Sequence, residues 1–266
     1  HEVELDQATF LKLSAFVYEK SGIVLGPQKE ALVHSRVIKR MKILGIRDFK
    51  SYYEYASQDK SDGELVELLN VISTNVTHFF RENRHFDFLG QVLKQWSKAG
   101  QTRFRIWSAA SSTGEEPYSL AITVREHLDD VRDVKILATD ISTKVLAKAR
   151  EGLYEPRHLE TVPPGLLCKY FRKEGDNYRA DDMLRKMLTF GRINLSKPPY
   201  PMRGPLDVIF CRNVMIYFDN EVRRKLLNSM YGLLKTGGYL MVGHAESLSG
   251  MLSEFKSVEP SVYVKG

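Results

Sequence analysis

The hydrophobic and polar positions of this chain follow two different patterns. Over about residues 1 to 72, apolar residues recur at helical spacing, one segment carrying them at Leu32, Val33, Val37, Met41 and Leu44. From Phe104 onward, short apolar runs alternate with helical segments, which is typical of an α/β fold. The sequence therefore predicts a helical domain over residues 1–72 and an α/β domain over residues 73–266.

The predicted helices of the first domain carry signals at their ends. Asp6 and Asp48 each precede a helical segment, and Asp favours this place because its side chain accepts a bond from the first-turn N–H groups. Ser21-Gly22 and Gly26-Pro27 interrupt the helical pattern. We therefore expect several short helices in this domain.

The most informative stretch of the α/β domain runs from Phe104 to Asp140. An apolar run gives way to the small-residue loop SAASSTG, then to a helical segment over Glu115–His127, and a second apolar run ends on Asp140. A strand, a loop, a helix and a strand ending in an acid form the unit that holds a nucleoside-containing cofactor. The loop brings N–H groups close to the ligand, and the acid can accept hydrogen bonds from both ribose hydroxyls.

Glycine usage in that loop argues against a dinucleotide. A pyrophosphate usually needs the pattern G-x-G-x-x-G, whereas this loop contains only Gly114. Glu115 and Glu116 would repel a phosphate but suit a cationic ammonium or sulfonium group, so S-adenosylmethionine fits better than NAD. The alternative is that both glutamates only complement the dipole of the helix.

The regular alternation stops near Gly152. A hairpin signature over about Lys169 to Arg179, turning near Gly175-Asp176-Asn177, is followed by a strand near Leu188, and we group these strands together. After this insertion, a buried strand leads into Arg212, and helices and strands continue to the end.

Polar residues follow the predicted strands at their carboxyl ends, where doubly wound sheets bind ligands. They are Ser108, Asp140, Asn194, Arg212, Asn213 and Tyr217. We expect them to face one crevice, with a salt-bridged structural role as the alternative for Arg212.

Two further features are given structural interpretations. The Lys197–Tyr200 segment KPPY is interpreted as a Pro-rich turn rather than as the related motif of amino-methyltransferases. His78, His85 and His244 lack metal-ligand spacing, so no metal site is expected and His244 is interpreted as a structural histidine.

Composition and charge narrow the class of protein. With 43% hydrophobic and 27% charged residues the chain is an ordinary globular protein, and no apolar segment approaches the ~18–20 residues of a membrane span. Cys168 and Cys211 form no CxxC pair, which disfavours a zinc-cysteine site and favours the cytoplasm. The net charge of +6 indicates an acidic partner. Arg36, Lys39 and Arg40 share one helix face, which is either a contact surface or merely solvated.

Five segments together carry a family resemblance: STNVTHFFRE, RIWSAASSTGEEPYSLAI, LATDIS, FGRINL and IFCRNVMIYFD. They resemble the bacterial chemotaxis receptor methyltransferases, the CheR family, along nearly the whole chain. One departure is Ala110-Ser111, where the family often has Gly-Cys. The resemblance implies a Rossmann-like class I S-adenosylmethionine-dependent methyltransferase sheet, an N-terminal helical domain that approaches the receptor, and an antiparallel β-subdomain inserted at about residues 152–190.

The resemblance also implies roles for individual residues. Contacts to the cofactor are expected from Asn75, Thr77, Arg81, Glu115, Asp140, Asn194, Leu195, Arg212 and Asn213. Arg81 is expected to orient the substrate carboxylate, and Tyr217 is expected near the methyl group. Receptor contacts are expected from Arg36, Lys39, Arg40, Arg172 and Arg179, the last two for a tail peptide at the receptor C-terminus.

The implied activity is methylation of glutamate carboxylates on membrane chemotaxis receptors, which yields methyl esters and S-adenosylhomocysteine. We expect a cytoplasmic monomer that reaches the membrane only through receptors and binds no nucleic acid. Two alternatives stay open at this point. One is a nucleic-acid methyltransferase that uses the basic helix face for phosphates, and the other is an S-adenosylmethionine sensor without turnover. The sequence does not identify the receptors or the glutamates.

Overall fold

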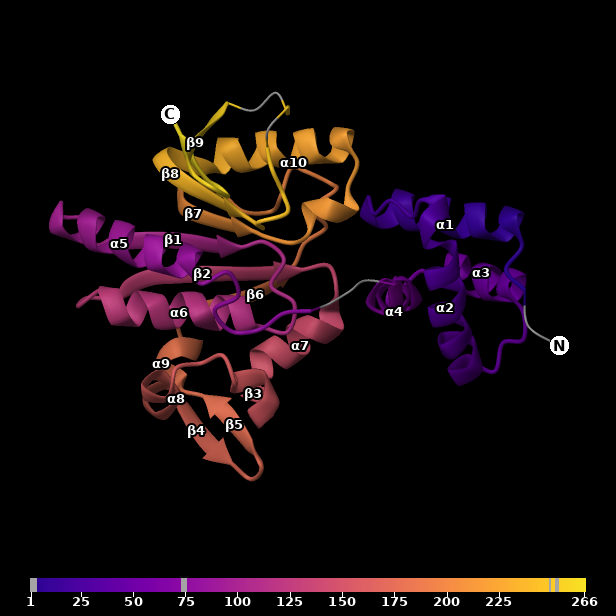
Figure 1. Cartoon of the computed structure of the whole chain (residues 1–266), viewed down its shortest axis with the longest axis horizontal. Coiled ribbons are helices and arrows are strands. Elements are labelled where there is room, and N and C mark those ends of the chain that lie inside the picture. The colour runs from indigo at the N-terminus through magenta and orange to yellow at the C-terminus, as the bar shows by residue number, and fades with distance from the viewer. Residues whose placement is uncertain (1–3, 73–75, 249, 252–253) are drawn as a thin grey trace. The chain divides into compact units, whose positions relative to one another are not determined.

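The computed structural model describes residues 4–72, 76–248, 250–251 and 254–266 (Figure 1). The chain forms two compact units, the first comprising residues 1–75 with 217–222 and the second residues 76–216 with 223–266. Within the described residues, no helix is long and apolar enough to cross a membrane.

The first unit is helical. Its elements are α1 (Gln7–Ser21), the 3-10 turn η1 (Pro27–Lys29), α2 (Glu30–Leu44), α3 (Phe49–Gln58) and α4 (Gly63–Ile72). The N-caps predicted for α1 and α3 are confirmed, because Asp6 accepts from the backbone N–H of Thr9 at 2.9 Å and Asp48 from that of Ser51 at 2.8 Å. Buried apolar side chains such as Leu13 hold these helices together.

The second unit is built on a seven-stranded sheet in the order β6-β2-β1-β7-β8-β10-β9. The strands are β1 (Arg103–Ser108), β2 (Asp133–Asp140), β6 (Leu188–Arg192), β7 (Leu206–Cys211), β8 (Leu234–Val242), β9 (Phe255–Glu259) and β10 (Val262–Lys265). The first five strands pair in parallel, and β10 pairs antiparallel with β8 and β9. The predicted α/β fold class is confirmed.

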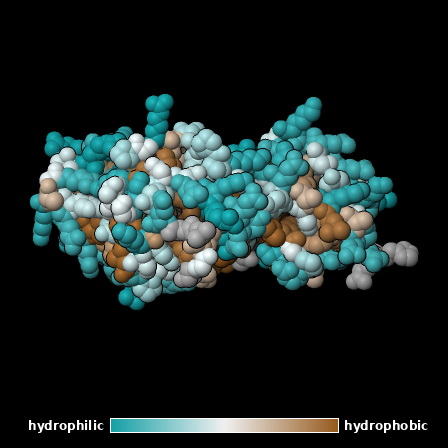
Figure 2. All heavy atoms as spheres, turned by 90° about the horizontal axis from the view of Figure 1, so that it is seen from above, coloured by the Kyte–Doolittle hydropathy of each residue, from teal (hydrophilic) through white to brown (hydrophobic). Residues whose placement is uncertain are grey.

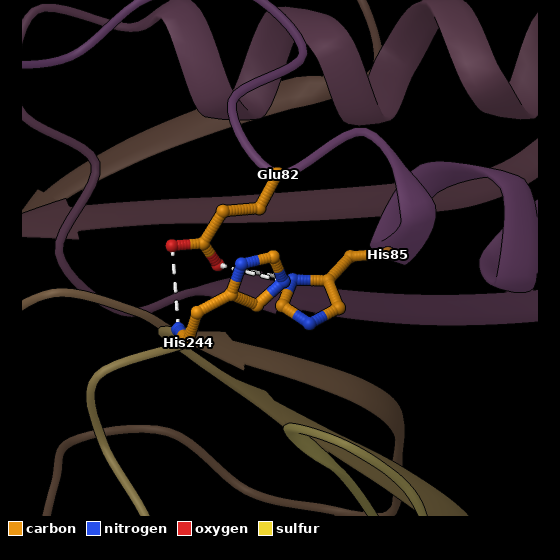
Figure 3. A group of neighbouring side chains, drawn as sticks. All are labelled: Glu82, His85 and His244. Carbon is orange, nitrogen blue, oxygen red and sulfur yellow. Dashed lines mark hydrogen bonds and ion pairs between the residues drawn. The ribbon is translucent and has the colours of Figure 1, made fainter.

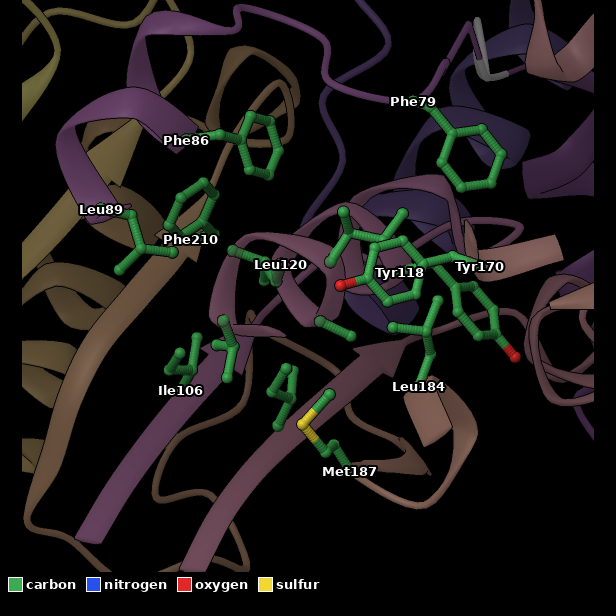
Figure 4. Close-up of a cluster of buried hydrophobic side chains, with 14 of the residues drawn as sticks. Phe79, Phe86, Leu89, Ile106, Tyr118, Leu120, Tyr170, Leu184, Met187 and Phe210 are labelled. Atoms are coloured by element: carbon green, nitrogen blue, oxygen red, sulfur yellow. The ribbon is translucent and has the colours of Figure 1, made fainter. Parts of the chain in front are cut away.

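Helices connect these strands: α5 (Arg84–Lys98), α6 (Glu115–His127), α7 (Thr143–Glu151), α8 (Pro164–Tyr170), α9 (Asp182–Arg185) and α10 (Asn220–Leu233), with 3-10 turns η2 (Pro156–Leu159) and η3 (Met215–Tyr217). The bounds predicted for α6 are confirmed. α5 and α6 share one buried cluster with the sheet, in which Phe86 and Leu89 of α5 meet Leu120 of α6 and Phe210 of β7 (Figure 4). This cluster fixes the start of both helices against the strands.

A second, smaller sheet has the order β3-β5-β4, with β3 (Leu153–Tyr154), β4 (Phe171–Glu174) and β5 (Asn177–Ala180) all antiparallel. The predicted hairpin is confirmed, but its grouping with the strand near Leu188 is wrong. Leu188 pairs with Ile136 and extends the parallel sheet. The apolar pattern of β6 fits either sheet, and only its backbone pairing to β2 distinguishes them.

The outer surface seen in Figure 2 is mostly hydrophilic. The exposed large apolar side chains come from several elements of both units: Leu11, Tyr18, Val24, Ile43, Tyr55, Val76, Ile216 and Val258. Isolated exposed apolar residues are normal for globular proteins.

Candidate active site

The site is set by the order of the strands. β1 lies between β2 and β7, so that the chain leads to β2 and β6 on one side and to β7 and β8 on the other. A doubly wound sheet opens a crevice at such a switch point, beyond the carboxyl ends of its strands. Ser108, Asp140 and Arg212 stand at or directly after the carboxyl ends of β1, β2 and β7. These three residues therefore lie along the edge that the sequence predicted.

Asp140 is held at the tip of β2 by the backbone. Ser112 N–H donates to its Oδ2 at 3.0 Å and Ser142 N–H to its Oδ1 at 3.0 Å. Burial raises the pKa of the Asp140 carboxyl, and these two hydrogen bonds oppose the rise. A carboxylate has about four acceptor positions, so each oxygen can take a further donor. The arrangement suits a pair of ribose hydroxyls, although that role stays a prediction.

The loop between β1 and α6 needs its single glycine. Gly114 has a φ of 103°, and a Cβ there would lie 2.5 Å from the Tyr154 hydroxyl and 2.9 Å from the Ala149 Cβ. Tyr154 donates to the Thr113 carbonyl at 2.8 Å. The loop is thus fixed in place immediately before α6 begins, and its N–H groups stay near Asp140.

The neighbouring acids Glu115 and Glu116 have different partners. Thr113 Oγ1 donates to Glu115 Oε2 at 2.7 Å, and burial raises the pKa of Glu115. Glu116 instead accepts from Ser108 Oγ at 2.7 Å and from Arg212 Nε at 2.8 Å. The charge of Glu116 is balanced by the buried guanidinium of Arg212. Glu115 is therefore the better candidate for the cationic end of the cofactor.

Arg212 is 5% exposed and serves the interior of the protein. Its guanidinium carbon lies 5.2 Å from the ring centre of Phe86 and 5.4 Å from that of Phe210, in addition to its bond with Glu116. This is the salt-bridged arrangement that the sequence left as an alternative. The cofactor contact expected of Arg212 stays a prediction beside this structural role.

The segment that carries Arg81 has an unusual backbone. Phe80 and Glu82 have φ values of 55° and 56°, a conformation that costs a non-glycine residue on the order of 1 kcal/mol. Phe80 N–H donates to Ser119 Oγ at 3.0 Å, and Arg212 Nη1 donates to the Arg81 carbonyl at 2.6 Å. These bonds hold the strained turn in place, which is a pattern common at functional sites.

The residues predicted to close over the cofactor have different outcomes. The Arg81 side chain donates to the Val76 carbonyl at 2.5 Å, within its own segment. Thr77 lies in the irregular stretch that leads to the strained turn. Asn75 falls outside the described residues. The cofactor contacts of all three stay predictions.

Asn194 and Leu195 lie just beyond β6, beside Asp140. Ile193 N–H donates to the Asp140 carbonyl at 3.1 Å, which places the Asn194 turn next to the tip of β2. The Leu195 carbonyl accepts from the buried Tyr200 hydroxyl at 2.8 Å. The KPPY segment therefore forms a turn whose last residue, Tyr200, is bonded within the protein, as the sequence favoured.

Glu246 is a site-forming residue that the sequence did not single out. It is 6% exposed, and its Oε2 accepts from the backbone N–H groups of Asn213 at 2.7 Å and Gly243 at 2.8 Å. Ile216 N–H donates to its other oxygen at 3.2 Å. Glu246 thereby holds Asn213, whose φ is 58°, at the end of β7. The available signal in the sequence was that Glu246, an acid, follows shortly after the predicted strand that ends before His244.

A second group that the sequence missed consists of Glu82, His85 and His244, which come together from separate segments (Figure 3). His244 N–H donates to Glu82 Oε1 at 3.3 Å, and His85 Nδ1 lies 3.1 Å from Arg212 Nη1. Burial and the positive charge of Arg212 lower the pKa of His85 to about 4. No local spacing could reveal this group, because His85 and His244 are far apart in sequence.

Tyr217 belongs to the helical unit rather than to the sheet. Its carbonyl accepts from Val24 N–H at 2.8 Å, and Lys29 Nζ lies 5.3 Å from the centre of its ring. Asp219, two residues later, accepts from the Tyr18 hydroxyl at 2.6 Å. The expected place of Tyr217 near the methyl group stays a prediction.

One of the three basic residues expected on the face of α2 pairs with an acid of its own unit, and the receptor contacts of all three stay predictions. Arg40 donates to Glu64 through Nε at 3.1 Å and Nη2 at 2.7 Å, and Tyr52 donates to the same carboxylate at 2.8 Å. Glu64 is 3% exposed, so Arg40 neutralises a buried charge. Arg36 donates to the Val71 carbonyl at 3.0 Å, and Lys39 is exposed.

The hairpin arginines are also engaged. Arg179 pairs with Glu174, its Nη2 lying 2.7 Å from Oε1, and it donates to the Glu151 carbonyl at 2.7 Å. Arg172 pairs with Asp181 at 3.1 Å while remaining mostly exposed. Arg172 is therefore the more accessible of the two for an acidic partner.

Comparisons with known proteins identify the family. Residues 8–73 match the CheR methyltransferase all-alpha domain, and residues 75–264 match the CheR methyltransferase SAM binding domain. A chemotaxis protein methyltransferase of Borreliella burgdorferi is 38% identical over 96% of this chain and 93% of its own. One of Salmonella typhimurium is 37% identical over 97% and 90%, and a probable one of Rhizobium etli is 42% identical over 88% and 90%.

Proposed function

Since the chain belongs to the CheR family of S-adenosylmethionine-dependent chemotaxis protein methyltransferases, we propose that its acceptors are glutamate side chains of chemoreceptors. The products would be glutamate methyl esters and S-adenosylhomocysteine. The observation that carries this proposal is the family match along nearly the whole chain, and the arrangement of Asp140 and Glu115 around one loop at the switch point supports its cofactor. One acid can accept from ribose hydroxyls and the other can meet an ammonium group.

The reaction needs little proton chemistry. When bound, the cofactor would supply an electrophilic methyl group on a sulfonium, and this group would pass to the acceptor oxygen with loss of the carbon–sulfur bond. A glutamate with an ordinary pKa of ~4.3 is ionised at neutral pH, so no general base has to remove a proton. Catalysis then depends on holding the oxygen and the methyl carbon ~3 Å apart and in line.

Arg81 and Tyr217 are our candidates for positioning the acceptor carboxylate. Arg212 fixes the Arg81 backbone through the Arg81 carbonyl. The Arg81 side chain donates to the Val76 carbonyl, a few residues earlier in the same segment. A guanidinium on a fixed backbone can rotate to form a two-point contact with a carboxylate. Tyr217 would assist through its hydroxyl.

Receptor contact is proposed for two surfaces. Lys39 and Arg36 on α2 are suited to an acidic receptor surface, whereas Arg40 is committed to Glu64. The small sheet has β4 at an edge, where an extended receptor tail peptide can add as a strand, with Arg172 nearby for its acidic groups. We further propose a cytoplasmic monomer that meets the membrane only through receptors and binds no nucleic acid.

One experiment tests the acceptor. The protein is incubated with methyl-labelled S-adenosylmethionine and receptor-containing membranes, and the labelled protein is then treated with mild base. A carboxyl ester releases its label, whereas an N-methyl group retains it. Label that stays on after base, or that accumulates in added RNA or DNA, would overturn the proposal. The Asp140→Ala variant serves as the control for label that does not depend on the cofactor site.

A further inference from the structure

The group Glu82, His85 and His244 offers three ligand atoms at close range. Within this group, one oxygen and two ring nitrogens all lie within 4.8 Å of one another. Glu82 Oε2 is 3.6 Å from His85 Nδ1 and 3.8 Å from His244 Nε2. Figure 3 shows the carboxylate and the two imidazoles converging from the strained turn, the start of α5 and the loop after β8.

These separations approach those of a metal site. Four ligands at ~2.0–2.2 Å around a tetrahedral ion lie roughly 3.3–3.6 Å from one another. The carboxylate-to-imidazole distances of 3.6 Å and 3.8 Å are equal to this range or a few tenths of an ångström longer. The His244 side chain is 53% exposed and can move by this amount. Two imidazoles and one carboxylate form a donor set that zinc accepts when a fourth position stays open.

An unsatisfied polar atom points to the same conclusion. Glu82 Oε2 is buried and has no hydrogen-bond partner. A buried carboxylate oxygen without a donor is costly unless a cation lies beside it. Glu82 and Glu116 both lie near Arg212, at 3.6 Å and 2.8 Å, so two carboxylates and one guanidinium leave one negative charge.

His85 Nδ1 already has a protein partner, which an ion has to replace. Arg212 Nη1 competes for Nδ1, at 3.1 Å. An ion at Nδ1 displaces that contact, and since the same Nη1 atom donates to the Arg81 carbonyl, the guanidinium has to turn while its Nε keeps the bond to Glu116.

We propose that Glu82, His85 and His244 form a binding site for a divalent transition-metal ion of the zinc type. Beside the site lies a cavity of about 180 Å³, which the two histidines line together with Arg84 and Glu259. The ion would fasten the start of α5 to the loop after β8. That loop also carries Glu246, which holds Asn213, so the metal would stiffen one side of the crevice.

Zinc titration tests the site on the full chain after treatment with a chelator. Calorimetry with ZnCl₂ should give one ion per chain with a Kd of about 10 μM or tighter, and a saturating excess should raise the melting temperature. When Co²⁺ is added in place of Zn²⁺, the protein should show the visible absorption bands of a cobalt ion in a low-symmetry site. Glu82→Gln and His244→Ala should each weaken zinc binding at least tenfold while keeping the circular dichroism spectrum of the parent.

His127→Ala is the matched control, because it removes one imidazole of the same unit, at the far end of α6, and leaves the group intact. It should bind zinc as the parent does. No binding of zinc by the parent at ~100 μM would overturn the proposal. Binding that is unchanged in both Glu82→Gln and His244→Ala would overturn it as well, since the ion would then sit elsewhere.

Discussion

Glu116 Oε2 accepts a hydrogen bond from Arg212 Nε at 2.8 Å, which joins the first turn of α6 to the end of β7. Both side chains are buried, and Ser108 at the end of β1 donates to the other oxygen of the Glu116 carboxylate. The pair therefore spans the switch point of the sheet. Because Arg212 also holds the Arg81 carbonyl, this ion pair couples the sheet edge to the strained turn.

Loss of Glu116 should destabilise the protein. Glu116→Ala leaves a buried guanidinium without its carboxylate, which typically costs about 3–5 kcal/mol of unfolding free energy. Urea denaturation followed by circular dichroism measures the change. Asp130→Ala is the control, because it breaks an exposed surface pair with Arg132 and should change the midpoint little. Equal midpoint shifts in the two variants would contradict the structural role of Glu116.

Loss of Asp140 should weaken the cofactor complex. In Asp140→Ala the two ribose hydroxyls lose a charged acceptor, so the affinity for S-adenosylmethionine should fall by about 1.5–3 kcal/mol. Isothermal calorimetry gives this value directly. Asp133→Ala, at the opposite end of the same strand, should bind as the parent does. A folded Asp140→Ala protein of parental affinity would remove the ribose assignment.

Glu115 should lower stability at neutral pH when no cofactor is bound. Burial raises its pKa in the folded protein above the unfolded value, so its contribution to stability is complete below the unfolded pKa. That contribution is lost as pH rises through the folded pKa. Glu115→Gln, which carries no charge, should therefore gain stability over the parent as pH rises from 4 to 7.5.

Denaturation midpoints at both pH values check this expectation for Glu115, with the exposed Glu160→Gln as control. Glu115→Gln should also bind S-adenosylmethionine more weakly, because a neutral amide attracts the ammonium group less. A stability difference that shrinks with rising pH would have the wrong sign and would show that Glu115 is not held as a desolvated carboxylate.

Arg81 and Tyr217 should differ in their effect on turnover. Arg81→Ala removes the proposed two-point contact with the acceptor and should lower kcat by tenfold or more. Tyr217→Phe keeps the ring and loses one hydroxyl, so its kcat should fall less. Steady-state methylation of receptor membranes at saturating cofactor measures both. Parental kcat in Arg81→Ala would exclude a positioning role.

The basic face of α2 should affect receptor methylation without affecting the cofactor. Reversing Arg36 and Lys39 to Glu should lower kcat/KM for receptors several-fold at low salt, with a smaller effect at high salt. Affinity for S-adenosylmethionine should stay the same. The pair Lys12→Glu and Lys50→Glu is the control, since it applies the same charge reversal on α1 and α3. Equal losses in both double variants would indicate a general charge effect.

Local pattern alone determined the main elements of this protein and the acid at the tip of β2. Asp6, Asp48 and the bounds of α6 could be predicted because capping and hydrophobic periodicity act within a few residues. Asp140 could be predicted because an acid that follows an apolar strand must lie at its end. Family resemblance then supplied roles that no spacing shows.

Tertiary structure decided the partners. The sequence did not identify the acid that pairs with Arg212, because Glu116 lies far away along the chain. The sequence places Arg40 on a basic helix face, and only the fold shows that its guanidinium pairs with Glu64. Glu82, His85 and His244 meet only when the start of α5 packs beside the end of β8. Which distant side chains become partners depends on how buried surfaces pack together, and the periodicity within a single segment does not determine that packing.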